Sequence, residues 1–563
     1  MTRGFLTNFI FALAVGALGV PLAKAQIAPD SGSILRQQQP PAIELPRTPP
    51  PALQVDQPER PQLQVPPDTR FVVSGLRITG QTAFSENELL MQVQYLVGKE
   101  AGLAELEQGA ARISRYYQAH GYVVARAYLP AQEIRDGKVE IAVLEGRIGR
   151  VVINNRSRVN DEFIASRMDG LQGQLLRNET IDPRVRLIYG LAGIGSQSQI
   201  LLEPGTKVGD ANLVLQLAPA PLVTGSVELD NHGNRFTGGD RLSGQINVQS
   251  PTGAGDVFSV RVTEGDPGLG LYRLSYQLPA GASGLRLGAD VSQVNYRLGR
   301  DFAPLGANGT ADTWLFYASY PLLLGRTYSV NAQASYQQTD LHDEVDATST
   351  VTDKASGVGT FAITGAWQDA FAGGGTSTVS ISYGAGELNI KSPVARAIDD
   401  LTARTHGSYQ KLNLGLTRLQ RLTERVSLYV QYTDQLANKN LDSWEKISLG
   451  GPNGVKAYPP GEASGDSGYL LNTEIRYTLS KGWFSGQTQL LALLDTGEVT
   501  VNKNQFAAGT NQRRLSSAGV GVNWMGARGI QLRLLVAHKL GNERATADTD
   551  QAMWGWLQLV KRF

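Results

Sequence analysis

Alternation of apolar and polar residues dominates the chain from residue 223 to residue 563. In residues 285–292, the sequence LRLGADVS places its apolar residues on one face and Arg286, Asp290 and Ser292 on the other. A period of two is that of a β-strand whose two faces meet different surroundings. Segments of this kind, roughly ten residues long, recur with turn residues between them, so this part of the chain is predicted to be all β.

Two architectures accept such strands, a soluble β-sandwich and a transmembrane β-barrel. The barrel is favoured because short connections, such as PTGAGD and LTERV, alternate with long ones at 341–358, 390–406 and 499–514. Tyr and Trp lie near the strand ends, as in an interfacial girdle, and the last strand, 554–563, ends on an aromatic residue. At about 20 residues per strand and connection, residues 220–563 predict a transmembrane β-barrel of about 16 antiparallel strands.

Helical periodicity marks the region before the barrel. The predicted elements are a strand, two helices and two strands, at 71–80, 85–97, 103–119, 122–129 and 138–144. The same order returns, without obvious sequence similarity, at 149–154, 161–168, 179–194, 199–203 and 212–217. We therefore predict two tandem α/β domains, at 69–146 and 147–219.

The first residues have the features of an export signal. Residues 1–25 are predicted to be a signal peptide, with a basic start, an apolar middle and the cleavage sequence Ala23-Lys24-Ala25. Residues 26–39 are predicted to hold a short helix. Residues 40–68 are a linker with 10 prolines between Pro40 and Pro67, a composition expected to exclude helix and sheet and to favour an extended chain.

Composition and motifs exclude several classes of function. The chain has 52 basic and 51 acidic residues, a balance that gives no sign of nucleic-acid binding, and it lacks Cys, which excludes disulfides and thiolate metal sites. The tetrapeptide at 465–468 matches the nucleophile sequence of serine proteases, but no His stands in a base motif for Ser467. The acidic residues at 340–344 are expected in a solvated outer loop. We therefore expect no enzyme, cofactor or metal site.

Several short motifs are shared with a known family. They are Gly121-Tyr122, Ala127-Tyr128-Leu129-Pro130-Ala131-Gln132, Asp136-Gly137-Lys138-Val139, Glu145-Gly146-Arg147, Leu229-Asp230-Asn231-His232-Gly233, Leu449-Gly450-Gly451, Val455-Lys456-Ala457-Tyr458 and Asp495-Thr496-Gly497. With these motifs in this order, the chain resembles the two-partner secretion transporters (TpsB), the outer-membrane pores of haemolysin and filamentous-haemagglutinin export systems. That family shares a superfamily with the barrel assembly factor BamA.

The resemblance implies a function for each region. The α/β domains correspond to periplasmic POTRA domains, the barrel to a bacterial outer-membrane pore, and the N-terminal helix to a plug. The transporter is expected to recognise an unfolded exoprotein, an adhesin or haemolysin of TpsA type, and to carry it to the cell surface. Outer-membrane lipid, and periplasmic chaperones and the barrel assembly machinery during biogenesis, are the other expected partners, without nucleic acid.

Two sets of residues are predicted to carry this function. The first joins a long loop to the barrel wall and consists of Val455, Lys456, Ala457, Tyr458, Asp495 and Gly497. The second is a groove for the exoprotein in the second POTRA domain, where an exposed strand edge would pair with an unfolded chain, and consists of Arg184, Leu187, Tyr189, Gln199, Ile200 and Leu201. These side chains could instead build the domain core, and for Leu187 the core is favoured over the groove.

The loop motif departs from the family pattern. Lys456 and Ala457 stand where the family has Arg and Gly. Lys keeps the charge but loses bidentate pairing, and Ala loses easy access to positive φ, so a weaker ion pair with Asp495 is expected. The alternatives are a BamA-like assembly factor, which the family comparison disfavours because BamA has five POTRA domains, and a nutrient porin or receptor, which needs none.

Overall fold

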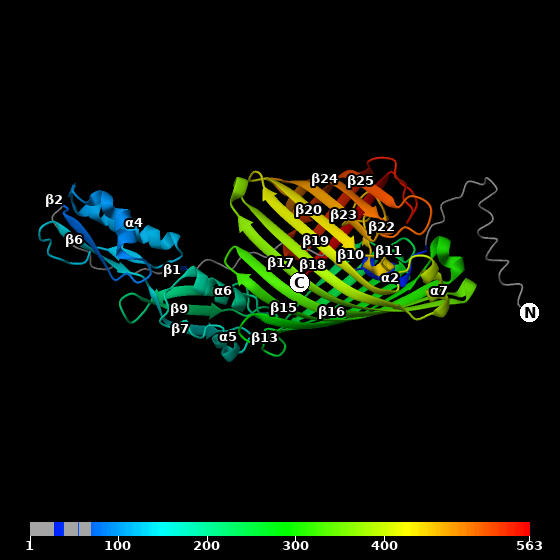
Figure 1. Ribbon diagram of the computed structural model, residues 1–563, viewed down its shortest axis with the longest axis horizontal. Coiled ribbons are helices and arrows are strands. Elements are labelled where there is room, and N and C mark those ends of the chain that lie inside the picture. Colours follow the sequence, from blue (N-terminus) through cyan, green and yellow to red (C-terminus); the bar gives the residue numbers. More distant parts are fainter. Residues whose placement is uncertain (1–27, 39–53, 56–68) are drawn as a thin grey trace, which may run out of the picture.

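The structure, a computed structural model, describes residues 28–38, 54–55 and 69–563. The predicted signal peptide lies outside these residues, as does most of the predicted linker. Figure 1 shows two small α/β domains at one end of a large barrel, helix α2 (Ser31–Gln37) inside the barrel, and helix α7 (Pro393–Leu401) at the opposite end. None of the helices in the described part of the chain has the length and apolar character needed to cross a membrane.

Within the described residues, sixteen antiparallel strands close into the predicted barrel. The barrel closes between its first and last strands, where the register runs from Ser226 opposite Arg562 to Asp230 opposite Gln558. The sixteen strands are β10 (Val223–Asp230), β11 (Gly238–Gln249), β12 (Val257–Pro267), β13 (Leu269–Ala280), β14 (Leu285–Arg297), β15 (Ala307–Leu324), β16 (Tyr328–Val345), β17 (Thr350–Asp369), β18 (Gly375–Ile390), β19 (Gly407–Arg421), β20 (Val426–Ala437), β23 (Ser467–Thr478), β24 (Gln487–Thr500), β25 (Gln512–Met525), β26 (Ile530–Lys539) and β27 (Met553–Arg562).

The alternation in the sequence separates an apolar outside from the lumen. On β15, Trp314 and Phe316 point outward and are 51% and 56% exposed, whereas Ala311 and Thr313 are buried on the lumen side. An outward apolar band is what lipid requires of a barrel wall.

One predicted connection is wrong. Residues 341–358 were expected to form a long outer loop, but β16 continues to Val345 and β17 starts at Thr350. These two strands have 18 and 20 residues, about twice the span of a bilayer, so they project beyond it. The outer face of the projecting part does not meet lipid, so it tolerates charged residues. The alternating hydrophobic pattern that predicts a strand is therefore missing there. The acidic segment at 340–344 therefore belongs to strand β16 and not to a loop.

The first POTRA domain (POTRA 1) has the predicted order of elements. They are β2 (Phe71–Val72), β3 (Gly75–Thr79), α3 (Glu86–Val93), the 3₁₀ helix η2 (Gln94–Leu96), β4 (Glu100–Ala101), α4 (Leu103–Ala119), β5 (Arg126–Tyr128) and β6 (Lys138–Leu144). Helix α4 buries Leu106, Ala110, Ile113 and Tyr117, which recur at helical spacing, against a sheet of order β3-β6-β5. The helix ends before Gly121, whose φ of +86° suits glycine.

The second POTRA domain (POTRA 2) repeats this order and lies against the barrel. It consists of β7 (Arg147–Asn155), α5 (Asp161–Ser166), α6 (Asn178–Tyr189), β8 (Gln199–Pro204) and β9 (Asp210–Leu217). Arg186 Nη1 donates to the Tyr328 carbonyl at 2.8 Å, and Arg286 Nη2 of the barrel donates to the Gly190 carbonyl at 2.7 Å. The Asn160 amide also donates to the Gly253 carbonyl at 2.8 Å. These bonds attach POTRA 2 to three turns at the near end of the barrel.

The Pro-rich linker contributes a strand, contrary to the expectation that it excludes sheet. Strand β1 (Gln54–Val55) pairs parallel to β8, with Gln54 opposite Leu201 and Val55 opposite Leu202. The sheet of POTRA 2 therefore has the order β1-β8-β9-β7. The pairing is possible because Leu53 to Asp56 contains no proline, so the backbone N–H groups needed for a ladder are present.

A buried carboxylate organises POTRA 1. Glu145, which follows β6, accepts hydrogen bonds from the backbone amides of Thr82 at 2.6 Å and Ala83 at 2.7 Å, from the Tyr117 hydroxyl at 2.9 Å, and from the Thr82 hydroxyl. Burial raises the pKa of the Glu145 carboxyl, but these hydrogen bonds outweigh it and hold that pKa below its ordinary value. The network joins both helices of the domain to the end of its central strand.

Replacing this carboxylate should destabilise POTRA 1 and leave the barrel intact. Glu145→Ala leaves four donors without an acceptor, so the free energy of unfolding of the domain should fall by about 3 kcal/mol. The contribution is present above the unfolded Glu pKa of about 4.3 and is lost as pH falls through the lower folded pKa. Hydrogen exchange of the amides in 138–144, in the full chain, measures it. Exposed Glu133→Ala is the control, and equal exchange in the two variants would contradict the assignment.

Candidate functional site

The long connection between β20 and β23, residues 438–466, forms a folded structure that we call loop 6. It contains the 3₁₀ helix η6 (Ser443–Glu445) and a ribbon of β21 (Ile447–Ser448) with β22 (Ser464–Gly465). Its tip is closed by hydrogen bonds from the Val455 amide to the Leu449 carbonyl at 2.7 Å and from the Gly451 amide to the Tyr458 carbonyl at 3.0 Å. The tip packs on β23, β24, β25 and β27, in a cluster of buried side chains inside the barrel.

Lys456 and Asp495 form the predicted ion pair in a buried setting. Lys456 Nζ lies 2.9 Å from Asp495 Oδ1, and the two side chains are 3% and 0% exposed. Asp495 also accepts from the Lys456 amide at 3.2 Å, from Asn472 Nδ2 at 2.7 Å and from the Ser517 hydroxyl at 2.9 Å. With its carboxylate oxygens satisfied in this way, Asp495 needs only a point charge from the loop, which Lys supplies as well as Arg. The ion pair is thus retained and is not solvated.

The other predicted loop residues lie around this pair. Val455, Ala457 and Tyr458 are fully buried, and Ala457 is absent from the residues with positive φ, so its backbone does not require glycine. A Cβ on Gly497 would lie 2.8 Å from Leu449 Cδ2, so the missing side chain lets loop 6 approach the wall. Outside the predicted set, Trp556 Nε1 donates to the Lys456 carbonyl at 2.7 Å.

Two further carboxylates of loop 6 were not recognised from the sequence. Glu462 is fully buried, forms an ion pair with Arg513 and accepts from the amides of Thr546 and Ala547, each at 2.7 Å. Asp466 is fully buried too, pairs with Lys446 at 2.9 Å and accepts from the Leu441 amide at 3.0 Å and the Lys503 amide at 2.7 Å. Their only signal in the sequence is that two acidic residues stand four apart in a Gly- and Ser-rich segment.

Helix α2 lies in the lumen and is bound to both the wall and loop 6. The Ser31 amide and hydroxyl donate to the Asp343 carboxylate of β16 at 2.7 and 2.9 Å. The N-cap residue, Asp30, accepts from the Ser443 hydroxyl at 2.8 Å. At the other end of the helix, Arg36 Nε donates to the Lys446 carbonyl at 3.1 Å. The helix is therefore held at both ends.

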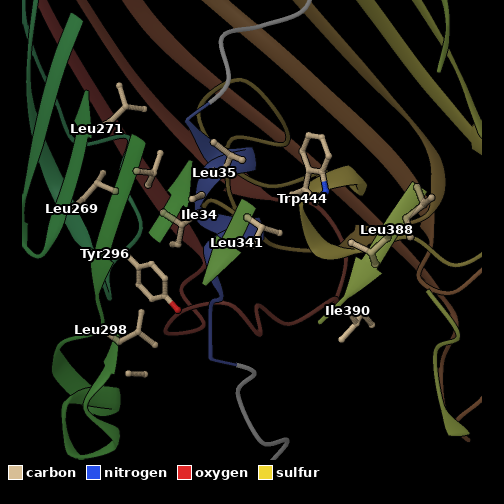
Figure 2. Packing of buried hydrophobic residues seen from close by; sticks show 14 of the residues in the cluster. Ile34, Leu35, Leu269, Leu271, Tyr296, Leu298, Leu341, Leu388, Ile390 and Trp444 are labelled. Atoms are coloured by element: carbon tan, nitrogen blue, oxygen red, sulfur yellow. The ribbon is translucent and has the colours of Figure 1, made fainter. Parts of the chain in front are cut away.

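A hydrophobic cluster surrounds the middle of the helix. Figure 2 shows Ile34 and Leu35 between wall side chains such as Leu269, Leu271 and Tyr296 and, on the other side, Trp444 of loop 6. Gly32 has no side chain to separate the helix from η6, since a Cβ there would lie 2.4 Å from the Ser443 hydroxyl. The plug helix predicted at 26–39 thus has a lumenal site, within 28–38 as far as the structure describes it.

Below the helix, toward POTRA 2, a cavity of about 420 Å³ remains in the lumen. Its lining includes Gln37 and Gln38 of the helix, Lys456 of loop 6, five Arg of the wall and two Glu, so it is a polar space with a basic balance. The Arg residues are Arg241, Arg261, Arg273, Arg476 and Arg533. Among the described residues, no group of three His, Cys, Asp or Glu is placed to hold a metal ion.

The predicted groove residues of POTRA 2 divide into two groups. Gln199, Ile200 and Leu201 lie on β8, at the edge where the linker strand β1 is paired. Tyr189 donates from its hydroxyl to the Ser198 carbonyl at 2.8 Å, next to that edge. Leu187 lies instead toward the barrel, because a Cβ on Gly284 would be 2.5 Å from its Cδ2.

Arg184 makes an internal contact, since its Nη1 donates to the Arg167 carbonyl at 2.7 Å.

POTRA 1 offers a second edge that was not predicted. Among the described residues, strand β5 pairs with β6 alone, and a groove of about 410 Å³ lies between β5 and α4. The Ala127 amide of this edge donates to the Ser114 hydroxyl of α4 at 2.8 Å, so part of the edge is already satisfied.

Comparison with known sequences identifies the family. Residues 209–524 match the haemolysin secretion/activation proteins ShlB/FhaC/HecB, and residues 71–146 match the ShlB-type POTRA domain. The chain belongs to this family. It is an outer-membrane β-barrel transporter that translocates an exoprotein across the outer membrane by two-partner secretion, with its POTRA domains in the periplasm.

Relatives of the transporter extend over most of its length. HuxB of Haemophilus influenzae, a heme/hemopexin transporter protein, is 28% identical over 487 residues, which cover 85% of this chain and 84% of HuxB. The structure of CdiB from Escherichia coli superimposes with a TM-score of 0.69 at 20% identity and covers 89% of this chain and 94% of CdiB. BamA from Haemophilus ducreyi, lacking POTRA domains 1–3, gives a TM-score of 0.51 at 15% identity, covering 88% of this chain and all of that chain. These structures share the fold.

Removing the buried cation should release the tip of loop 6. Lys456→Ala leaves Asp495 charged and buried, at a cost of about 3–5 kcal/mol. We expect hydrogen exchange of the amides in 454–458 to accelerate by about two orders of magnitude in the purified transporter. Lys456→Arg restores the family residue and should keep exchange slow. Unchanged exchange in Lys456→Ala would show that the pair does not hold the tip.

Proposed function

We propose that the transporter rests closed, with helix α2 and loop 6 filling the lumen, and that it opens when an unfolded exoprotein engages the POTRA domains. The observation that carries this proposal is the position of α2. The helix is bound at both ends inside the barrel, to Asp343 of the wall and to Ser443 and Lys446 of loop 6. An extended chain could not pass the same part of the lumen while the helix is there.

The exoprotein is proposed to bind by adding a strand to the edge of β8, the prediction made for Gln199, Ile200 and Leu201. The pairing of the linker strand β1 with that edge supports it, because there the edge pairs with an extended segment of the chain in parallel register. Tyr189 is proposed to shape this side of POTRA 2, whereas Arg184 and Leu187, which contact Arg167 and the barrel side, are not proposed to contact cargo. In the resting state the linker and the exoprotein would compete for one edge.

The partners follow from this scheme. The cargo is proposed to be a TpsA-type adhesin or haemolysin, the outward apolar band to contact outer-membrane lipid, and periplasmic chaperones with the barrel assembly machinery to act during biogenesis. Transport is proposed to need no catalysis, cofactor or nucleic acid. Coexpression with a large secreted protein, where the genome encodes one beside this gene, followed by assay of the medium, tests the cargo. Secretion of that protein supports the proposal, whereas loss of other outer-membrane barrels on depletion would favour an assembly factor.

Deleting the plug should open the pore. A transporter lacking residues 26–39 loses the hydrogen bonds to Asp343, Ser443 and Lys446 but no barrel strand, so it should insert normally and conduct severalfold more current in planar bilayers. A matched control is Arg36→Ala, which removes one anchor and should raise only the frequency of opening. Equal currents in the deletion variant and the unaltered transporter would rule out a plug.

Freeing the β8 edge should strengthen binding of unfolded exoprotein. Replacing both Gln54 and Val55 by Pro removes the N–H groups of β1, so the linker should leave the edge. We expect the apparent Kd for an unfolded N-terminal fragment of the neighbouring exoprotein to fall up to about tenfold, the value of one to two backbone hydrogen bonds. Fluorescence anisotropy measures it. Gln54→Ala with Val55→Ala keeps the N–H groups and is the control; the same Kd in both variants would exclude competition.

A further inference from the structure

A row of apolar side chains crosses the lumen face of four neighbouring strands. Leu271, Val294, Ala311 and Leu341 are successive Cα partners across β13, β14, β15 and β16. All four are at most 7% exposed. Because directly paired residues point to the same face of a sheet, they form one continuous apolar stripe, which we call the collar.

The collar borders a polar part of the lumen. The next lumen-facing row toward POTRA 2 consists of Arg273, Ser292, Thr313 and Thr339, paired in the same order. The cavity beyond that row is basic and polar. Exposure of an apolar stripe to water costs free energy, and an apolar cover removes that cost.

Ile34 and Leu35 of helix α2 cover the collar in this structure. Both side chains belong to the same buried cluster as the four collar residues, and the helix packs on β14, β15 and β16. Figure 2 shows Ile34 and Leu35 close to Leu341, with Leu271 on the wall to one side of the helix. The cover is therefore a short segment that presents two adjacent apolar side chains.

We propose that the collar binds apolar side chains of the exoprotein while its extended chain is in transit, in exchange for Ile34 and Leu35. The proposal rests on the proposed plug function of α2. The occupant is the exoprotein because the collar lines the lumen through which the transporter carries its cargo, and α2 must leave this part of the lumen before an extended chain can pass. An extended chain presents alternate side chains to one side, so its apolar residues meet the collar while its polar residues face the basic wall.

The exchange gives the collar two roles that act in sequence. It holds the plug until cargo arrives, and it then lowers the cost of uncovering the wall, since cargo replaces the plug side chains. Exoproteins rich in alternating apolar residues, the pattern of β-structure, are the cargo class that fits such a stripe.

Single-channel recording on the plug-deleted pore tests the collar directly. The probes are two peptides added from the POTRA side: one in which Thr and Leu alternate between Gln-rich ends, and one in which Gln replaces each Leu. We expect the Leu peptide to block the pore about tenfold longer, which corresponds to about 1.4 kcal/mol. Leu341→Gln should remove most of this difference.

Matched variants separate the collar from general effects on the lumen. Leu341→Met keeps an apolar side chain and should keep the difference in block time, as should Ser292→Gln, which places the same amide in the polar row beneath. Val294→Thr, which preserves shape, should reduce the difference if Leu341→Gln fails to fold. Equal block times for the two peptides, or a difference that persists in both collar variants, would overturn the proposal.

Secretion by the full-length transporter distinguishes failure of the collar from failure of the proposed function. If the collar contacts cargo, Leu341→Gln should lower export severalfold while raising conductance, because plug and cargo both lose a contact. If it only seats the plug, export should stay at the normal level or rise, which contradicts the proposal and leaves plugging by α2 intact. Unchanged conductance together with unchanged export would count against both.

Discussion

A closed barrel of sixteen strands is wider than its own side chains can fill, and this constraint governs the rest of the structure. Closure gives the backbone N–H and C=O groups of the first and last barrel strands hydrogen-bond partners, which lipid cannot provide. It also leaves a wide interior that would conduct ions if nothing filled it. The chain fills the interior with two segments that are not part of the wall, loop 6 and helix α2. Each must be stable in place, and at least one must be able to leave.

The two segments are held by different chemistry. Loop 6 is fixed by three carboxylates that are fully buried, Asp495, Glu462 and Asp466, each with a cation and backbone or side-chain donors around it. Breaking such a pair costs more than the pair contributes to stability, because the remaining charge stays buried. Helix α2 has only seven residues and is held by hydrogen bonds at its ends and by Ile34 and Leu35 in between. The loop is therefore the lasting part of the obstruction, and the helix is the removable part.

Much of this arrangement could be predicted from the sequence, for reasons that particular residues make clear. The strand alternation predicted the barrel because one face meets lipid, and the motif residues Lys456, Asp495 and Gly497 converge as expected. The burial of the Lys456–Asp495 pair was not predicted, since burial depends on how the whole tip packs. Asp343 was assigned to a solvated loop, because the residues around it in the sequence do not show that β16 projects beyond the bilayer. Its contact with Ser31 could not be predicted either, because the two residues are distant in sequence. The β1 pairing was missed because the surrounding prolines dominate the pattern of a linker in which two residues suffice for a strand.

The position of the linker joins the two ends of the transport path. Helix α2 lies in the lumen and β1 lies on the edge of POTRA 2, and the same chain connects Gln37 to Gln54. If cargo displaces β1, the segment that follows α2 loses its anchor on POTRA 2 and the helix loses a restraint on leaving the lumen. Because coupling free energies are reciprocal, loss of the helix from the lumen must favour release of the edge by the same amount. Binding of cargo at the periplasmic domain and opening of the pore would then be coupled equilibria. The length and stiffness of the proline-rich segment would determine the size of the coupling free energy.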